Sequence, residues 1–159
     1  MIGNKLSKNH LLETSLAILT LLWFLSHMVN LLTYWPELSQ EVPIQSNDTE
    51  SKWLLWLLPT LAIGLWLFIH RLTRYPERLN YIGLTEENKQ VMYAKGRRMS
   101  LILKNGGSLS LLFANQAFLH SVVGQSQAIP LTMAIVLSIM TVLYPVYFLV
   151  WSAFMQGKK

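Results

Sequence analysis

The sequence predicts an all-α fold: an integral membrane bundle of four helices with both termini in the cytoplasm. Composition, four long apolar stretches and the placement of positive charge predict it. Of the 159 residues, 52% are hydrophobic and only 13% are charged, about half the charge usual in a soluble domain. Each apolar stretch is long enough as a helix to cross a hydrocarbon core of about 30 Å, and none shows the alternation of a barrel strand.

The chain is expected to form one transmembrane domain, residues 1–159. The expected spans are residues 12–34, 53–70, 104–123 and 130–154. The expected connections are an outer loop at 35–52, an inner loop at 71–103 and a short outer connection at 124–129.

Positive charge gives the orientation. Twelve of the thirteen Lys and Arg lie in the tails, in the inner loop or beside it, and only Lys52 lies in the outer loop. Positively charged flanks stay in the cytoplasm. We therefore predict a protein of the bacterial cytoplasmic (inner) membrane, with its N-terminus and C-terminus inside.

The first span is read as an uncleaved helix, because its apolar run is too long for a secretory signal and no small-residue cleavage site follows. Pro36, after two aromatic residues, is expected to end it. In the second span Pro59 predicts a kink, and Pro145 predicts another in the fourth. His70 and the Lys104 ammonium are expected at the membrane interface.

Pro76 and Gly83 break the chain in the inner loop, and Thr85 followed by two acidic residues is typical of a helix N-cap. From Glu86 the sequence allows one helix to continue into the third span. That would make a long third helix extending into the cytoplasm, unless Gly96 or the Gly106–Gly107 pair interrupts it.

The third span is the least hydrophobic of the four, and its polar residues share one side. At about 100° per residue they fall within a sector of roughly 140°, which should face other helices or a cavity rather than lipid. The first span adds polar residues on one face, and both helices run from inside to outside. The predicted polar cluster in the outer leaflet comprises His27, Asn30, Asn115, Gln116 and His120.

Two interpretations of this cluster stay open. The groups can be hydrogen bonds that pack helices together. Alternatively they line a polar cavity, with His27 and His120 as proton carriers or weak metal-ligand candidates. No cofactor is otherwise expected, since the chain has no cysteine and no catalytic, phosphate-binding or zinc motif.

The outer loop is acidic, so the two faces of the protein differ in the sign of their charge. Against the single Lys52 it carries Glu37, Glu41, Asp48 and Glu50.

The stretch from Leu31 to Met99 resembles the domain-of-unknown-function 1648 family of small bacterial membrane proteins. The similarity lies in "WPELSQEVPIQSNDTESK", in the proline-bearing "LLWLLPTLAIGLWLFIHRL" and in "RYPERLNYIGLTEENKQVMYAKGRRM". Relatives include the immunity protein against the sporulation-delaying toxin, so the resemblance implies an immunity or signalling role. The matching positions are Pro43, Lys52, Pro59, Asn80, Tyr81, Thr85, Glu86 and Asn88.

The sequence departs from the family pattern after Val42–Pro43. Members usually show a His, an aromatic residue and a Gly there, whereas this chain has a shorter stretch without His or Gly. No physical requirement accounts for some residues that the inner loop shares with the family, so we expect a cytoplasmic contact there. Its residues are Asn80, Tyr81 and Asn88.

The predicted function is therefore that of a non-enzymatic membrane protein that binds a hydrophobic or cationic peptide or a membrane-protein partner. Two alternatives are a small transporter or metal-dependent membrane enzyme centred on the polar cluster, and an accessory subunit of a larger complex. No nucleic acid partner is expected, because residues flanking the spans account for the net charge of +5. No pattern in the sequence selects an oligomeric state.

Overall fold

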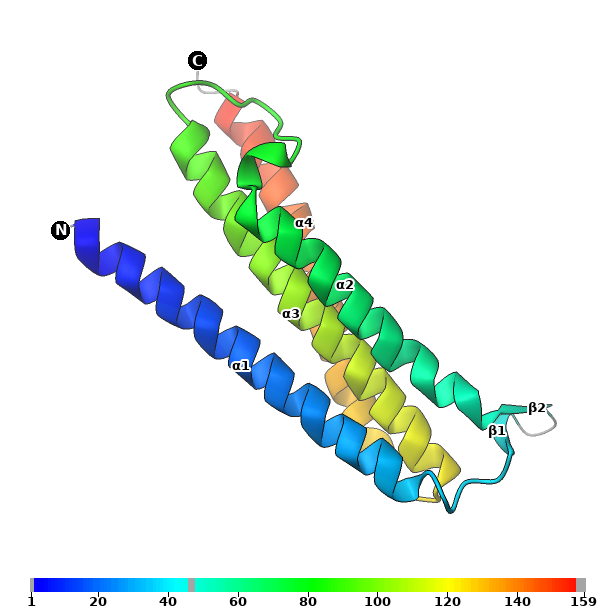
Figure 1. The fold of residues 1–159 in the computed structure, drawn as a ribbon. Coiled ribbons are helices and arrows are strands. Elements are labelled where there is room, and N and C mark those ends of the chain that lie inside the picture. Colours follow the sequence, from blue (N-terminus) through cyan, green and yellow to red (C-terminus); the bar gives the residue numbers. More distant parts are fainter. Residues whose placement is uncertain (1, 46–47, 157–159) are drawn as a thin grey trace.

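The computed structural model describes residues 2–45 and 48–156, which form four long helices and a short hairpin (Figure 1). The helices are α1 (Ile2–Tyr34), α2 (Leu57–Arg74), α3 (Lys89–Val122) and α4 (Ala128–Gln156). The hairpin strands are β1 (Glu41–Gln45) and β2 (Asp48–Ser51), and 3₁₀ turns occupy Lys52–Trp56 and Pro76–Arg78. The predicted all-α class is confirmed.

The helices lie side by side, so the bundle has two ends (Figure 1). We call the end with β1 and β2 the hairpin end, and the end with both chain termini the termini end. α1 and α3 run toward the hairpin end, and α2 and α4 run back.

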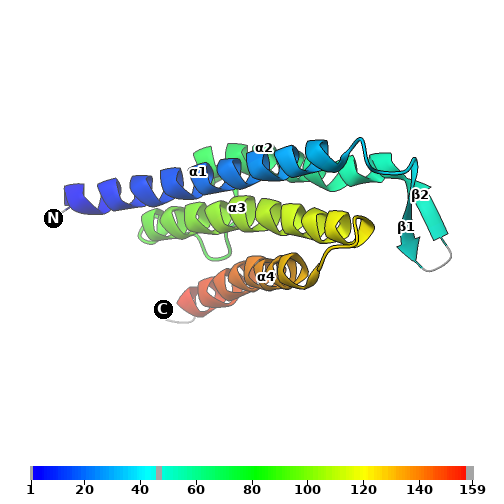
Figure 2. The same ribbon diagram turned by 90° about the horizontal axis from the view of Figure 1, so that it is seen from below.

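α3 is the central helix of the bundle. α1, α2 and α4 each pack mainly against α3 rather than against one another, and both views place α3 in the middle (Figure 2). Glycines on α3 permit the close approach of α2 and α4. A Cβ on Gly106 would overlap the Thr141 hydroxyl of α4, and one on Gly107 would lie 3.0 Å from Leu65 Cδ2 of α2.

Apolar side chains face outward and polar ones face α3. Three segments are long and apolar enough to cross a membrane, namely Glu13–Tyr34, Lys52–Arg74 and Ala128–Phe154. α3 is not among them, although the sequence predicts a span at 104–123. Its buried positions include many polar residues, which the three apolar helices cover. These are Ser100, Lys104, Asn105, Ser108, Ser110, Asn115 and Gln116.

The predicted long third helix is present. α3 has 34 residues and continues without a break past Gly96 and the Gly106–Gly107 pair. Because α2 extends to Arg74 and α3 begins at Lys89, most of the stretch predicted as an inner loop is helical.

The stretch predicted as an outer loop contains a β-hairpin. β1 and β2 pair antiparallel, with Val42 opposite Glu50 and Pro43 opposite Thr49. The side chain of Val42 is fully buried, while those of Glu41 and Pro43 on either side are exposed. A strand of five residues is too short for alternation to stand out in the sequence.

The kink predicted within the second span is wrong. The apolar segment divides into the 3₁₀ turn Lys52–Trp56 and α2, and Pro59 is the third residue of α2. A proline in the first turn of a helix breaks no helical hydrogen bond, because the N–H groups there have no partner within the helix. Pro145 does lie inside α4.

Candidate functional site

Near the hairpin end, side chains from α1 and α3 form one continuous chain of hydrogen bonds. Asn115 Nδ2 lies 2.8 Å from His27 Nε2, and His27 Nδ1 lies 2.5 Å from Gln116 Oε1. Gln116 Nε2 lies 2.7 Å from His120 Nε2. His120 Nδ1 lies 3.0 Å from the backbone carbonyl oxygen of Ser126. Four of the five residues predicted as a polar cluster are thus brought together.

The Ser126 carbonyl sets the direction of this chain. A carbonyl can only accept, so His120 Nδ1 carries a proton and donates it. For a neutral ring, His120 Nε2 then accepts from the Gln116 amide, whose oxygen turns toward His27. His27 donates through Nδ1 and accepts from Asn115 through Nε2. If both rings are neutral, each imidazole is therefore protonated on Nδ1.

A pocket of about 340 Å³ lies beside the chain, between α1, α3 and the start of α4. That volume is typical of a small-ligand site. The stacked rings of Trp23 and Phe113, 4.4 Å apart, form part of its wall. Its polar lining comes from Ser26, His27, Asn30, Gln116, His120 and Ser126. Asn30, the fifth residue of the predicted cluster, therefore lies at the same site.

One acceptor in this cluster is unmatched. Asn115 Oδ1 is buried and has no hydrogen-bond partner among the described residues. Such an acceptor costs about 1–3 kcal/mol when it is left unpaired. Helix packing alone gives no reason to keep it, so it favours a role for the cluster beyond packing.

The two imidazoles beside the pocket are already engaged in hydrogen bonds. Both imidazole Nε2 lone pairs already accept amide N–H groups, so a metal would displace a hydrogen bond at each ring. Among the side chains that the structure describes, no three from His, Asp or Glu lie close enough to hold a metal. The described lining of the pocket supplies amides, imidazoles and hydroxyls and contains no carboxylate.

The hairpin end has an acidic surface, because its one lysine, Lys52, is buried. Lys52 is 9% exposed, and its ammonium lies 3.4 Å from the Leu38 carbonyl oxygen and 4.8 Å from the centroid of the Trp35 ring. The side chains of Glu37, Glu41 and Glu50 are exposed, and Glu41 accepts a hydrogen bond from Thr49. The side chain of Asp48 lies outside the described part of the chain.

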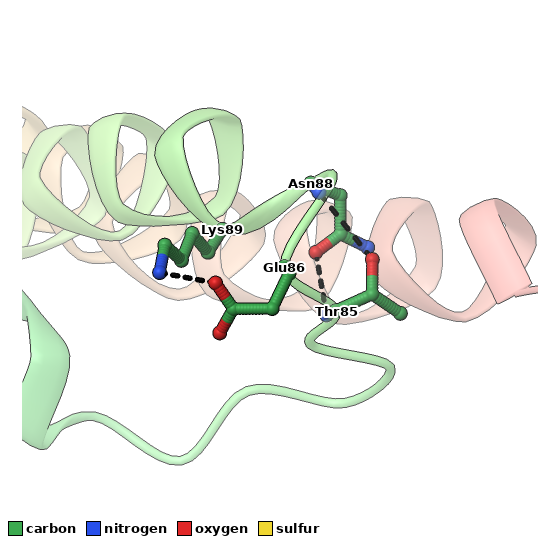
Figure 3. Close-up of polar contacts among 4 residues, drawn as sticks. All are labelled: Thr85, Glu86, Asn88 and Lys89. Carbon is green, nitrogen blue, oxygen red and sulfur yellow. Dashed lines mark hydrogen bonds and ion pairs between the residues drawn. The ribbon is translucent and has the colours of Figure 1, made fainter.

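Figure 3 shows why Asn88 is needed in the turn before α3. The Thr85 backbone N–H donates to Asn88 Oδ1 (2.8 Å), and the Asn88 backbone N–H donates to Thr85 Oγ1 (3.3 Å). This reciprocal pair has the i, i+3 pattern of a capping box, but it closes the turn before α3, whose N-cap residue is Asn88 rather than the predicted Thr85. Asn88 Nδ2 also donates to the carbonyl of Gly83, and Lys89 pairs with Glu86.

Tyr81 attaches the inner loop to the helices. Its hydroxyl donates to the Pro76 carbonyl (2.7 Å), and its ring lies against Gly96, where a Cβ would overlap the phenol. The Tyr93 and Phe148 rings lie beside it. Burial raises the pKa of Tyr81 to about 12. Tyr81 and Asn88 therefore have internal structural partners, whereas the neighbouring Asn80 is exposed.

Comparisons with known proteins add no family to this description. No family model, no curated protein and no solved structure matches the chain. The function is therefore inferred from the sequence and from the geometry of the described residues.

Proposed function

We propose that the protein is an integral protein of the cytoplasmic membrane, with both termini inside, that acts by binding rather than by catalysis. Three apolar helices that turn their polar contacts inward onto α3 support insertion. Every described Lys and Arg except Lys52 lies in the half of the bundle nearer the termini end. This distribution supports a cytoplasmic termini end.

The observation that carries the binding proposal is the pocket beside His27 and His120. It offers hydrogen-bonding groups within an exposed apolar surface, and Ile129 at its rim is 78% exposed. The exposed glutamates of the hairpin end lie at the same end of the bundle. Polar groups, apolar surface and negative charge together fit a cationic amphipathic peptide, or a cationic helix of a membrane-protein partner.

The binding proposal agrees with the resemblance of residues 31–99 to the domain-of-unknown-function 1648 family. An immunity factor must hold a peptide that arrives from outside the cell. The outer carboxylates would steer a cationic peptide toward the surface, and apolar contacts and the pocket would then retain it. Membership of that family and the immunity-like role are part of the proposal.

The proposal is tested with the full chain in phosphatidylcholine nanodiscs and a labelled cationic amphipathic peptide. The test variant carries Glu37→Gln, Glu41→Gln, Asp48→Asn and Glu50→Gln. We expect it to bind the peptide several-fold more weakly than the wild type at low salt. Near 1 M salt, where the Debye length is about 3 Å, the difference should disappear. Fluorescence anisotropy measures both affinities.

The matched control changes acidic residues at the opposite end, with Glu77→Gln, Glu86→Gln and Glu87→Gln, all of which are exposed. It should bind the peptide as the wild type does. Equal losses in the two variants, or a loss that is the same at both salt concentrations, would contradict the proposal.

A further inference from the structure

A second site lies toward the termini end, where α1, α2 and α3 line a cleft of about 410 Å³. Its cations are Arg74 from α2 with Arg97 and Lys104 from α3, and His70 lies among them. Glu13 of α1 is the carboxylate in the lining. With a neutral histidine, the lining carries an excess of two positive charges.

Lys104 is the unusual member of this cleft. It was expected to reach the membrane interface, yet it is 1% exposed. Its ammonium lies over the Trp66 ring, 4.6 Å from the centroid, and 3.5 Å from His70 Nδ1, and the His70 ring stacks on Trp66. Among the described residues no carboxylate lies within ion-pair distance of Lys104. A buried ammonium without an anion is costly, and it retains N–H donors for one.

The one carboxylate of the cleft is already engaged. Glu13 Oε2 lies 2.5 Å from a guanidinium nitrogen of Arg97. That pair closes one side of the cleft and joins α1 to α3. Lys104 and Arg74 are therefore the cations of the lining that have no carboxylate partner among the described residues.

An apolar groove continues from the cleft. It has a volume of about 250 Å³, lies between α1 and α2, and has α3 as its floor. Leu21 lines both the groove and the cleft, and Trp66, which carries the Lys104 ammonium on its ring, lines the groove. The remaining groove lining includes Phe24, Ile63, Leu67 and Leu112.

We propose that the cleft and the groove together bind one anionic phospholipid. Lys104 and Arg74 hold its phosphate, and an acyl chain lies along the groove. A free phosphate would use only the cleft, so the adjoining groove favours the lipid. The choice of a lipid rests on the proposed membrane location, whereas the phosphate contact rests on the cleft alone.

Native mass spectrometry of the full chain in detergent tests this site by titration with phosphatidylglycerol and phosphatidylcholine of equal chain length. Phosphatidylglycerol should bind more tightly. Lys104→Met should weaken that binding about tenfold, because a charge-assisted hydrogen bond to the phosphate is lost. Lys95→Met is the matched control, since Lys95 also lies on α3 with its ammonium over a tryptophan, Trp151, but outside the cleft. It should bind phosphatidylglycerol like the wild type.

A second pair of variants avoids any change to the buried core. Arg74→Gln should weaken phosphatidylglycerol binding several-fold, and Arg71→Gln, also exposed on α2 but outside the cleft lining, should leave it unchanged. Equal binding of the two lipids, or equal losses within each pair of variants, would overturn the site. Inorganic phosphate binding as tightly as phosphatidylglycerol would overturn the lipid assignment. The peptide titration uses a neutral bilayer and acidic residues at the other end, so either proposal can fail without the other.

Discussion

For neutral rings, one backbone carbonyl decides the tautomers of the two histidines in the polar cluster. Because Ser126 can only accept, each donor from His120 back to Asn115 is fixed in turn. A second proton on His120 would require the Gln116 amide to turn over, which would also reverse the hydrogen bond to His27. The site is thus an ordered donor chain, and a change at its Ser126 end reaches the buried histidine.

At Tyr81 the protonated phenol is favoured by the fold. Burial raises the pKa of Tyr81 from 10.0 to about 12, so this contribution to stability is present below pH 10 and is lost as the pH rises toward 12. Tyr81→Phe removes the hydrogen bond to Pro76 and should cost about 1 kcal/mol near neutral pH. The deficit of the variant relative to the wild type should shrink in alkaline solution.

Thermal unfolding in detergent, followed by circular dichroism from neutral pH upward, measures that difference. Tyr75→Phe serves as the control, because Tyr75 is 46% exposed, and its effect should be small at every pH. If the stability loss of Tyr81→Phe stays constant up to about pH 12, the protonated phenol of Tyr81 does not stabilise the fold in this pH-dependent way.

The burial of Lys104 is a feature that the sequence did not lead us to expect. Its position near the start of the predicted span favoured an ammonium that reaches the interface. A signal was present, because Arg97 lies seven residues earlier, close to two helical turns, on the same face of α3. The pattern could not show that α1 and α2 cover that face, since those contacts join residues far apart in the sequence.

Glycine on α3 sets the distance between α3 and α4. A Cβ at Gly106 would overlap the Thr141 hydroxyl, so Gly106→Ala should lower the free energy of unfolding by about 1–3 kcal/mol, the usual cost of overpacking. Gly64→Ala on α2 is the matched control, since no atom lies within 4 Å of its Cβ position. It should stabilise α2 by up to about 1 kcal/mol because Ala is the better helix former. Thermal unfolding compares the two.

Combining Gly106→Ala with Thr141→Ala sharpens this test. The Thr141 hydroxyl is buried without a hydrogen-bond partner among the described residues. Removing it makes room for the new methyl group and leaves no polar group unpaired. The double variant should therefore recover most of the lost stability. If the double variant does not recover stability, the cost of Gly106→Ala does not come from the contact with Thr141.

Among the elements, the helices were predictable and the hairpin was not. Long apolar runs predicted the helices, and the long α3 followed from the absence of a strong break after Glu86. The hairpin depends on the burial of Val42 and on the Lys52 backbone N–H, which donates to the Gln40 carbonyl. Neither the burial of Val42 nor this hydrogen bond can be predicted from a short stretch of sequence.

For the whole molecule, the proposed orientation is tested with single cysteines, which the cysteine-free chain makes simple. Gln40→Cys lies next to β1 and Gln90→Cys lies at the start of α3, and both positions are exposed. In intact cells a membrane-impermeant maleimide should label the variant at position 40 and not the variant at position 90.

Permeabilised cells provide the control, because both cysteines should then react equally. Labelling of position 90 alone in intact cells would reverse the proposed orientation. Labelling of both positions in intact cells would contradict an inserted bundle.

The sequence by itself determined the helical class, the apolar helices, the charge difference between the two ends and the polar side of the third helix. Each is a local property, since composition and periodicity show what a segment is and which of its faces is polar. The tertiary structure alone decided which partners those faces meet. It joined His27 to Asn115 and Gln116, buried Lys104 beside Trp66, and gave Tyr81 a place against Gly96. These pairings depend on how three helices pack around α3. The spacing of residues along one segment does not encode that packing.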